Sequence, residues 1–121
     1  MDWIIVVITL ALLIVLFLVK RSGQIAESAA AEHLKHGALV IDVRSPAEFS
    51  SGHLQRAINI PIAQIETLVA RQVHDKTQVL LLHCQTGARS GMARRKLAAL
   101  GYTRVYNLGS YERAARIAGS V

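Results

Sequence analysis

Residues 79–100 read VLLLHCQTGARSGMARRKLAAL, and this stretch decides how the chain folds. An apolar run over 79–82 leads into His83, Cys84 and a short loop that contains glycine. The run predicts a buried strand, and apolar residues at helical spacing after Ser90 predict a helix that ends at Gly101. Ser90 is a suitable N-cap for that helix. The stretch therefore predicts a strand, a tight loop and a helix, with the only cysteine of the chain at the carboxyl end of the strand.

The place of Cys84 has a chemical meaning. Ligands gather at the carboxyl ends of the strands in an open parallel sheet. A loop that enters a helix N-terminus also points backbone N–H groups at one place, which favours an anion. We expect those dipoles and Arg89 to lower the pKa of the Cys84 thiol, and the thiolate is the nucleophilic form. The alternative is a small buried hydrophobic residue, as many free cysteines are. Gly87, Arg89 and the helix start favour a reactive cysteine.

Three stretches of the chain resemble rhodanese-type sulfurtransferases. Residues 84–90, Cys-x-x-Gly-x-Arg-Ser, are similar to the active-site loop of that family. Residues 40–61, VIDVRSPAEFSSGHLQRAINIP, resemble its N-terminal signature of Asp-x-Arg, Glu-Phe, Gly-His and Ala-x-Asn-x-Pro. Residues 104–109, RVYNLG, resemble its last strand and the following turn. The resemblance covers residues 25–117 and implies a parallel α/β sheet with helices on both faces, which the alternation of strands and helices also indicates.

Cysteine phosphatases are the nearest rival interpretation, because they also carry His-Cys before a short loop that ends in Arg-Ser. Their loop has one residue more between the cysteine and the arginine than this chain, which has Gln85, Thr86, Gly87 and Ala88. The shorter loop makes a smaller cradle, which fits the outer sulfur of a persulfide better than a phosphate with its oxygens. Phosphatase or arsenate chemistry is therefore the weaker hypothesis.

The loop predicts transfer of sulfur through a persulfide on Cys84. The thiolate attacks the sulfane sulfur of thiosulfate or of a persulfide donor, and a thiol or cyanide acceptor then removes it. Because the chain has one cysteine, the acceptor comes from outside. Arg89 is expected to bind the anionic donor and to stabilise charge. Backbone N–H groups of the loop and of the helix N-terminus are expected to hold the outer sulfur, at Gln85, Thr86, Gly87, Ala88 and Ser90.

The sequence also predicts supporting roles for some residues outside the loop, and it predicts no metal or cofactor site. The resemblance implies that Asp42 and Arg44 help to hold the catalytic loop, and that His53 supports the backbone instead of acting as a base. His33 and His36 have no third partner nearby in the sequence, so no metal is expected, and no cofactor. A second hypothesis is a non-catalytic module that carries or senses sulfur or binds a partner.

The N-terminal segment over residues 3–19, WIIVVITLALLIVLFLV, has no charge and one polar side chain, that of Thr9. As a helix it reaches about 25 Å, against a hydrocarbon core of about 30 Å, and it is apolar on every side, which is typical of a membrane span. The positive pair at 20–21 follows the apolar run, so an uncleaved anchor is favoured over a signal peptide. The positive-inside rule then predicts a bacterial inner-membrane protein with a cytoplasmic catalytic domain.

The sequence therefore predicts one transmembrane helix in an anchor over residues 1–21, followed by a rhodanese-like domain over 22–121. The chain carries 14 Lys and Arg against 8 Asp and Glu, which suits an anionic membrane surface. Few aromatic residues and no stacking pattern argue against a nucleic-acid partner. Strands are expected over 38–43, 57–61, 79–82 and 103–107, and helices over 25–36, 45–52, 62–73, 90–100 and 111–117.

Overall fold

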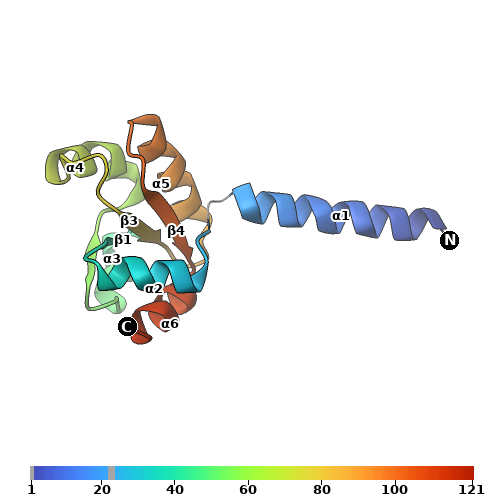
Figure 1. Cartoon of the computed structure of the whole chain (residues 1–121), viewed down its shortest axis with the longest axis horizontal. Coiled ribbons are helices and arrows are strands. Elements are labelled where there is room, and N and C mark those ends of the chain that lie inside the picture. The colour runs from blue at the N-terminus through green and yellow to red at the C-terminus, as the bar shows by residue number, and fades with distance from the viewer. Residues whose placement is uncertain (1, 22–23) are drawn as a thin grey trace.

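The computed structural model describes residues 2–21 and 24–121. Within these ranges, four parallel strands form one sheet in the order β2-β1-β3-β4 (Figure 1). The strands are β1 Leu39–Asp42, β2 Ala57–Asn59, β3 Leu80–His83 and β4 Val105–Gly109. The helices are α1 Asp2–Arg21, α2 Glu27–Lys35, α3 Pro46–Ser51, α4 Ile65–Gln72, α5 Ala88–Ala99 and α6 Tyr111–Gly119, with a 3₁₀ turn, η1, over Ile62–Gln64.

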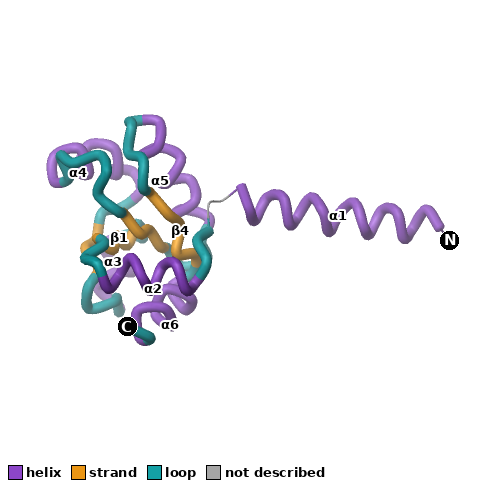
Figure 2. Tube along the Cα trace, viewed as in Figure 1, coloured by secondary structure: helices purple, strands orange, loops and turns teal. Residues whose placement is uncertain are grey.

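Alternate residues of the central strands build two separate apolar cores, because successive strand residues face opposite sides of the sheet. In β3, Leu80 and Leu82 pack with residues of α4 and α5, whereas Leu81 packs with residues of α2 and α6. In β1, Ile41 joins the first core and Val40 the second. Figure 2 shows these helices on the two sides of the strands. Burial of each such side chain contributes about 1.5–3 kcal/mol, so both layers hold the central strands in place.

The strand register brings the polar strand ends together. Asp42 at the end of β1 lies opposite His83 at the end of β3, and Leu82 lies opposite Asn107 in β4. An irregularity after Leu82 then pairs His83 with Gly109. Since all strands are parallel, their carboxyl ends share one edge of the sheet, directly before the loop that starts at Cys84.

The predicted α/β fold is confirmed, and each predicted strand is present within two residues of its expected bounds. The predicted N-cap of α5 was wrong. The helix begins at Ala88 with Gly87 as its N-cap, and Ser90 lies inside the first turn. Gly87 adopts φ +100°, a left-handed conformation that glycine accepts without strain and that lets the loop enter the helix two residues early. This frees the Ser90 hydroxyl for other contacts.

Two helices also differ from their predictions. The expected helix over 25–36 starts later, at Glu27, and buries Ala30 one turn before Leu34. The expected helix over 62–73 is divided into the 3₁₀ turn η1 and α4, with Ile65 and Val69 buried against the sheet. Helix α3 begins with a capping box, because Ser45 and Glu48 each accept the other's backbone N–H.

Helix α1 extends away from the domain (Figure 1). Its apolar side chains are exposed, including Trp3 at 68% and Phe17 at 62%. Over the residues that are described, no helix has both the length and the apolar character needed to cross a membrane. The transmembrane helix predicted over 3–19 is therefore not supported. The side chains of the positive pair at 20–21, and residues 22–23 of the predicted linker, lie outside the described residues.

Candidate active site

The catalytic loop is held against the backbone of the last strand. The Cys84 N–H donates to the Gly109 carbonyl over 3.2 Å, and the Tyr111 N–H donates to the Gln85 carbonyl over 3.3 Å. A Cβ atom on Gly87 would lie 3.2 Å from the Gly109 backbone, so only glycine allows this close approach without a shift. The loop thus turns tightly between β3 and α5, and Cys84 is fully buried beneath it.

The sulfur of Cys84 faces hydrogen-bond donors of the loop. The Gly87 N–H donates to Sγ over 2.9 Å, and the Ser90 hydroxyl lies 3.5 Å from it. Burial alone would raise the pKa of the Cys84 thiol, but hydrogen bonds from the Ser90 side chain and from the backbone of Ser90, Gly87 and Thr86 outweigh it and lower the pKa. Donors of the loop and of the helix start therefore stabilise the thiolate form of Cys84, as expected for the backbone dipoles, whereas Arg89, which was also expected to lower this pKa, is not among the main causes.

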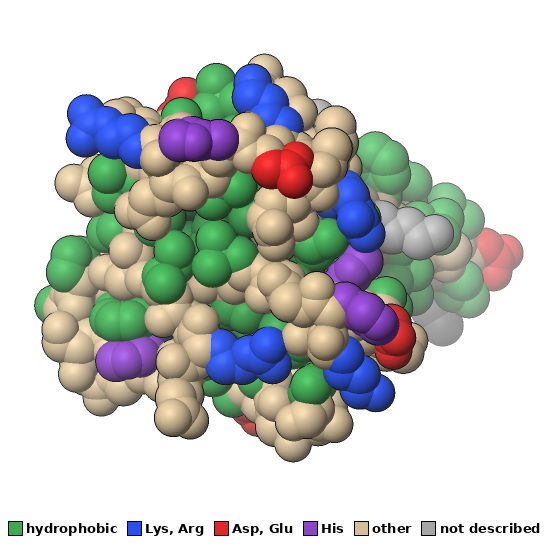
Figure 3. Space-filling model, turned by 60° about the vertical axis from the view of Figure 1, so that its left-hand side comes forward, with side chains coloured by type: hydrophobic (Ala, Val, Ile, Leu, Met, Phe, Trp, Pro, Cys, Tyr) green, Lys and Arg blue, Asp and Glu red, His purple; other side chains and the backbone are tan. Residues whose placement is uncertain are grey.

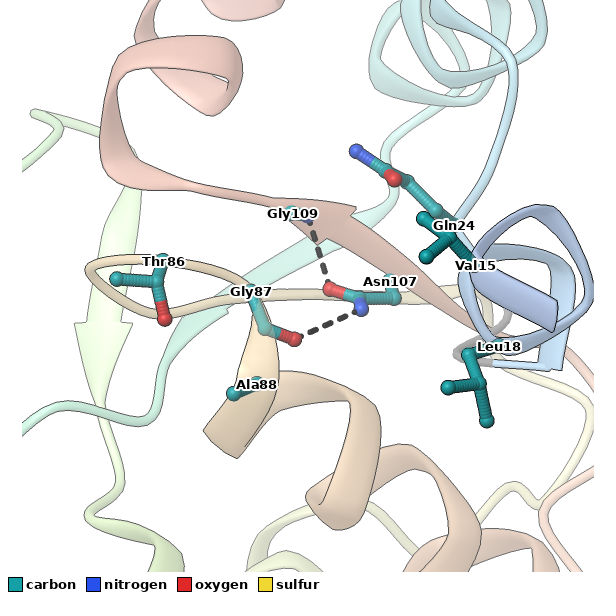
Figure 4. Close-up of a pocket in the computed structure, with 8 residues that line it drawn as sticks. All are labelled: Val15, Leu18, Gln24, Thr86, Gly87, Ala88, Asn107 and Gly109. Atoms are coloured by element: carbon teal, nitrogen blue, oxygen red, sulfur yellow. Dashed lines mark hydrogen bonds between the residues drawn. The ribbon is translucent and has the colours of Figure 1, made fainter. Parts of the chain in front are cut away.

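Asn107 of β4 fixes the loop and the first turn of α5 from below. Its Oδ1 accepts from the Ser90 hydroxyl over 2.7 Å and from the Gly109 N–H over 2.8 Å. Its amide donates to the Gly87 carbonyl over 3.1 Å. Figure 4 shows Asn107 pointing toward this loop, beside a cavity of about 310 Å³. The cavity is lined by Thr86, Gly87, Ala88, Asn107, Gly109 and Gln24, and by Val15 and Leu18 of α1.

Arg89, the predicted anion-binding residue, is bound to a carboxylate. Its two terminal nitrogens donate to the two oxygens of Glu48, over 2.6 and 2.9 Å. Both side chains are about one-third exposed, so the pair lies at the surface of the site. The hydrogen bonds from Arg89, followed by those from Ser45, lower the pKa of Glu48 to about 2. Glu48 is therefore ionised and balances the charge of Arg89 at neutral pH.

A second ion pair lies beneath the loop. The Arg44 guanidinium binds both oxygens of Asp42, with a shortest distance of 2.8 Å, and both side chains are buried. Arg44 also donates to Gln85 Oε1 over 3.2 Å and to the Gly52 carbonyl over 2.7 Å, and it lies 4.6 Å from the centre of the Tyr111 ring. Arg44 thus links β1 to the loop, which agrees with the supporting position implied for it.

His83 is the buried neighbour of the nucleophile. Its Nδ1 lies 3.2 Å from the Cys84 carbonyl. Its buried Nε2 has no hydrogen-bond partner among the described residues and lies 3.7 Å from Asp42 Oδ2. Burial, only partly opposed by Asp42 and the Cys84 carbonyl, lowers the pKa of His83. The imidazole is therefore neutral at pH 7 and serves as packing under the loop.

A family model described as "Rhodanese-like domain" matches residues 26–116. The chain belongs to this family. It is 40% identical over 80 residues to thiosulfate sulfurtransferase PspE of Escherichia coli, covering 66% of this chain and 71% of that protein. The solved structure of a rhodanese with anions from E. coli superposes with a TM-score of 0.61 at 36% identity, covering 64% of this chain and 91% of that one. A human single-domain sulfurtransferase, TSTD1, gives 0.68 at 27% identity, covering 78% and 96%.

These relationships make the protein a rhodanese-type sulfurtransferase. The rhodanese loop brings together most residues that the sequence singled out. Gly87 and Ser90 lie at the thiol of Cys84, and Arg89 lies at the surface of the site, bound to Glu48. Asp42 and Arg44 lie behind them. Gln85 contributes its side chain to Arg44, and Thr86 its backbone to the thiol. The individual catalytic roles of these residues remain predictions.

Three residues at the rhodanese site were missed from the sequence as functional residues: Asn107, Glu48 and Tyr111. Glu48 stands in the Glu-Phe pair of the N-terminal signature and was interpreted only as a first-turn residue. Asn107 carried no local signal. Tyr111 is the first residue of α6, the helix after the last strand, and its ring lies against the Arg44 guanidinium.

The histidines outside the loop have structural surroundings. His53 Nδ1 lies 2.8 Å from the Phe49 carbonyl and its ring stacks on Phe49, as expected for a residue that supports the backbone. His33 stacks on Tyr106, at 5.2 Å between ring centres. Among the described residues, no three His, Cys, Asp or Glu side chains gather to hold a metal ion.

Proposed function

We propose that the protein moves a sulfane sulfur from thiosulfate or a persulfide donor, through a persulfide on Cys84, to an external thiol or to cyanide. The observation that carries the proposal is the hydrogen bond of 2.9 Å from the Gly87 N–H to Cys84 Sγ, in a loop whose other donors lower the pKa of the thiol. A stabilised thiolate at a helix N-terminus is an activated nucleophile.

The first half-reaction needs no cofactor. The Cys84 thiolate attacks the outer sulfur of thiosulfate, a new S–S bond forms, and the bond to the sulfonate sulfur breaks. The electron pair of that bond leaves with sulfite, so the products are Cys84–S–S⁻ and SO₃²⁻. Backbone N–H groups of Thr86, Gly87 and Ser90 would hold the new terminal sulfur, because they already donate toward the sulfur of Cys84.

The second half-reaction regenerates the thiolate. A nucleophile such as cyanide or a thiolate attacks the terminal sulfur of the persulfide, and the Cys84 sulfur leaves with the electron pair. The chain has no second cysteine that could perform this attack. The acceptor is therefore a separate molecule, and it must reach a sulfur that projects outward from a buried residue.

Intact mass spectrometry tests the proposal. The full chain in mild detergent, and a Cys84→Ser variant beside it, are treated with thiosulfate and then with cyanide. We expect one added sulfur atom on the wild type alone, with release of sulfite, and its loss as thiocyanate after cyanide. Absence of added sulfur from either thiosulfate or a low-molecular-weight persulfide would refute the proposal and favour the non-catalytic module.

We also propose that α1 attaches the domain to a bacterial inner membrane, with the catalytic domain in the cytoplasm. The support is the run of uncharged residues over 3–19 and the exposure of its side chains, for example Ile5 at 64% and Leu12 at 57%. Figure 3 shows apolar side chains on this segment behind the domain, while Lys and Arg are scattered over the face in view. Exposed apolar surface of this extent is typical of a site that contacts a membrane or a partner protein.

Extraction and proteolysis test the attachment. Membranes from cells that express the full chain are washed with alkaline carbonate, and we expect the protein to stay in the membrane fraction. In right-side-out vesicles, we expect protease to leave the domain intact. Release by carbonate, or digestion of the domain from outside, would contradict the attachment or the orientation respectively.

A further inference from the structure

Arg44 and Arg89, two cations at the catalytic loop, are each paired with a carboxylate. Arg44 is bound to Asp42 in the interior, and Arg89 is bound through two hydrogen bonds to Glu48 at the rim. In each pair one positive charge meets one negative charge, so neither pair has a net charge at neutral pH. A dianion that approaches Cys84 therefore meets backbone donors and a neutral rim, not an unpaired guanidinium.

The carboxylate at the rim is held in place independently of Arg89. Glu48 occupies the third position of α3, where its Oε1 accepts the Ser45 N–H over 3.1 Å, and Ser45 in turn accepts the Glu48 N–H over 3.2 Å. This reciprocal cap fixes the carboxylate against the helix start. Arg89 is thus drawn to a fixed negative charge, and Glu48 would remain there when a donor arrives.

Charge effects connect this carboxylate to the reacting centre. Besides its hydrogen bonds to Glu48, Arg89 is also stabilised in its charged form by the negative charges of Glu48, Cys84 and Asp42. The charge of Glu48 likewise adds to the stabilisation of Arg44. Glu48 therefore offsets the attraction that the Arg89 guanidinium would exert on an anionic donor, and this offset matters more as the charge of the donor rises.

We infer that Glu48 is a specificity-determining residue that selects against highly charged sulfur donors, an inference that rests on the proposed persulfide chemistry. With Glu48 in place, the rim favours donors of low negative charge, such as a thiosulfonate or the persulfide of a thiol. Thiosulfate, a dianion, is therefore a poorer donor than it would be if the same loop lacked the Glu48 carboxylate.

Two donors that share one chemistry separate charge from reactivity. Thiosulfate carries two negative charges and expels sulfite, whereas methanethiosulfonate carries one and expels methanesulfinate. For both, kcat and KM are measured with the full chain in detergent and cyanide as acceptor. We expect Glu48→Gln to lower KM for thiosulfate and to raise the ratio of kcat/KM, thiosulfate over methanethiosulfonate, by about two- to tenfold.

Matched variants distinguish charge from position. Glutamine still caps α3, so Glu48→Gln is expected to fold. Glu48→Asp keeps the charge at the rim and should leave the ratio near that of the wild type. Glu66→Gln removes the same charge from an exposed pair with Lys96, 3.6 Å apart on α4 and α5, and should also leave the ratio unchanged. The effect of Glu48→Gln should shrink in about 1 M salt, where the screening length is about 3 Å.

The outcomes separate this inference from the proposed function. If Glu48→Gln leaves the ratio where Glu66→Gln leaves it, or lowers it because Arg89 is misplaced, the inference is wrong while persulfide chemistry stands. If the wild type gains no sulfur from either donor, the proposed function fails first. A raised ratio in Glu48→Gln that high salt reduces, together with a wild-type ratio in Glu48→Asp, supports selection by charge.

Discussion

The Ser90 hydroxyl donates a hydrogen bond of 2.7 Å to Asn107 Oδ1. The same hydroxyl oxygen lies 3.5 Å from Cys84 Sγ, and a hydroxyl has only one proton to donate. Asn107, the sulfur and the Gly87 carbonyl, which lies 3.2 Å from the hydroxyl, therefore compete for it. Because a hydrogen bond to an ionised acceptor is stronger than one to a neutral acceptor, ionisation of the thiol draws the hydroxyl toward the sulfur.

We predict that Ser90→Ala raises the pKa of the Cys84 thiol, since it removes the side-chain donor that lowers that pKa. Alkylation of the thiol at pH 7 should slow by about ten- to a hundredfold, the effect of one lost hydrogen bond of about 1.5–3 kcal/mol to a charged group. The measurement is the rate of iodoacetamide labelling against pH. Ser120→Ala, at the exposed end of the chain, is the control and should label like the wild type. An unchanged labelling profile in Ser90→Ala would contradict the role of the hydroxyl.

Gly87→Ala is expected to lower the free energy of unfolding by about 1–3 kcal/mol, because a left-handed φ strains an alanine and its Cβ would press on the Gly109 backbone. A shift of the strained loop should also turn the residue 87 N–H away from the sulfur, so persulfide formation should fall with stability. Urea unfolding measures the first effect and mass spectrometry the second. Gly119→Ala, in α6 with open space around it, should be neutral or slightly stabilising. Equal unfolding curves for the two variants would count against strain at Gly87.

His83 is expected to make folding stability depend on pH. Burial holds its pKa below the unfolded value, so the folded state binds the proton less readily than the unfolded chain. Stability is then complete above the unfolded pKa, about 6.5, and is lost as the pH falls below it, with a slope of at most about 1.4 kcal/mol per pH unit from this residue. Urea unfolding between pH 7.5 and 5 should show a smaller slope in His83→Gln. The exposed His74→Gln should keep the slope of the wild type.

Removing one member of the buried pair of Asp42 and Arg44 is expected to lower the free energy of unfolding. Arg44→Leu leaves a buried carboxylate without its main partner, so we expect a loss of about 3–5 kcal/mol in the free energy of unfolding. Asp42→Asn with Arg44→Leu together should cost less than the sum of the two single changes. Urea unfolding of all three variants completes the cycle. Strict additivity would mean that the two side chains do not stabilise each other.

The exposed pair of Lys96 and Glu66 provides the comparison for that cycle. Its atoms lie 3.6 Å apart with both side chains about half exposed, so Lys96→Ala should change the free energy of unfolding by less than about 1 kcal/mol.

The sequence was sufficient where the determinants are local. The strand before Cys84, the glycine loop and the helix after it lie within residues 79–100, and their apolar spacing and turn residues predict them directly. The exact helix start was missed, because Ser90 carries a good N-cap side chain and the left-handed φ of Gly87 leaves no separate mark in the sequence.

Residues that reach the site from elsewhere could not be found in this way. Asn107 meets Ser90 across 17 positions and Glu48 meets Arg89 across 41, so no spacing rule connects them. Strand order and register decide these contacts, and only the folded sheet brings the carboxyl end of β4 beneath the loop. The pairing of Arg89 with Glu48 was missed for the same reason. In a sequence, an arginine beside a cysteine indicates an anion site, whether or not a carboxylate from elsewhere in the chain already binds that arginine.

The contacts between β4 and the catalytic loop have a consequence for the order of events during synthesis. A ribosome delivers residues 84–90 well before residues 105–109, whose Asn107 and Gly109 hold the loop. An unfinished or truncated chain therefore presents an ordinary cysteine, with a thiol that is mostly protonated at neutral pH. The donors that lower the pKa of Cys84 are therefore held in place only once β4 has docked on the sheet.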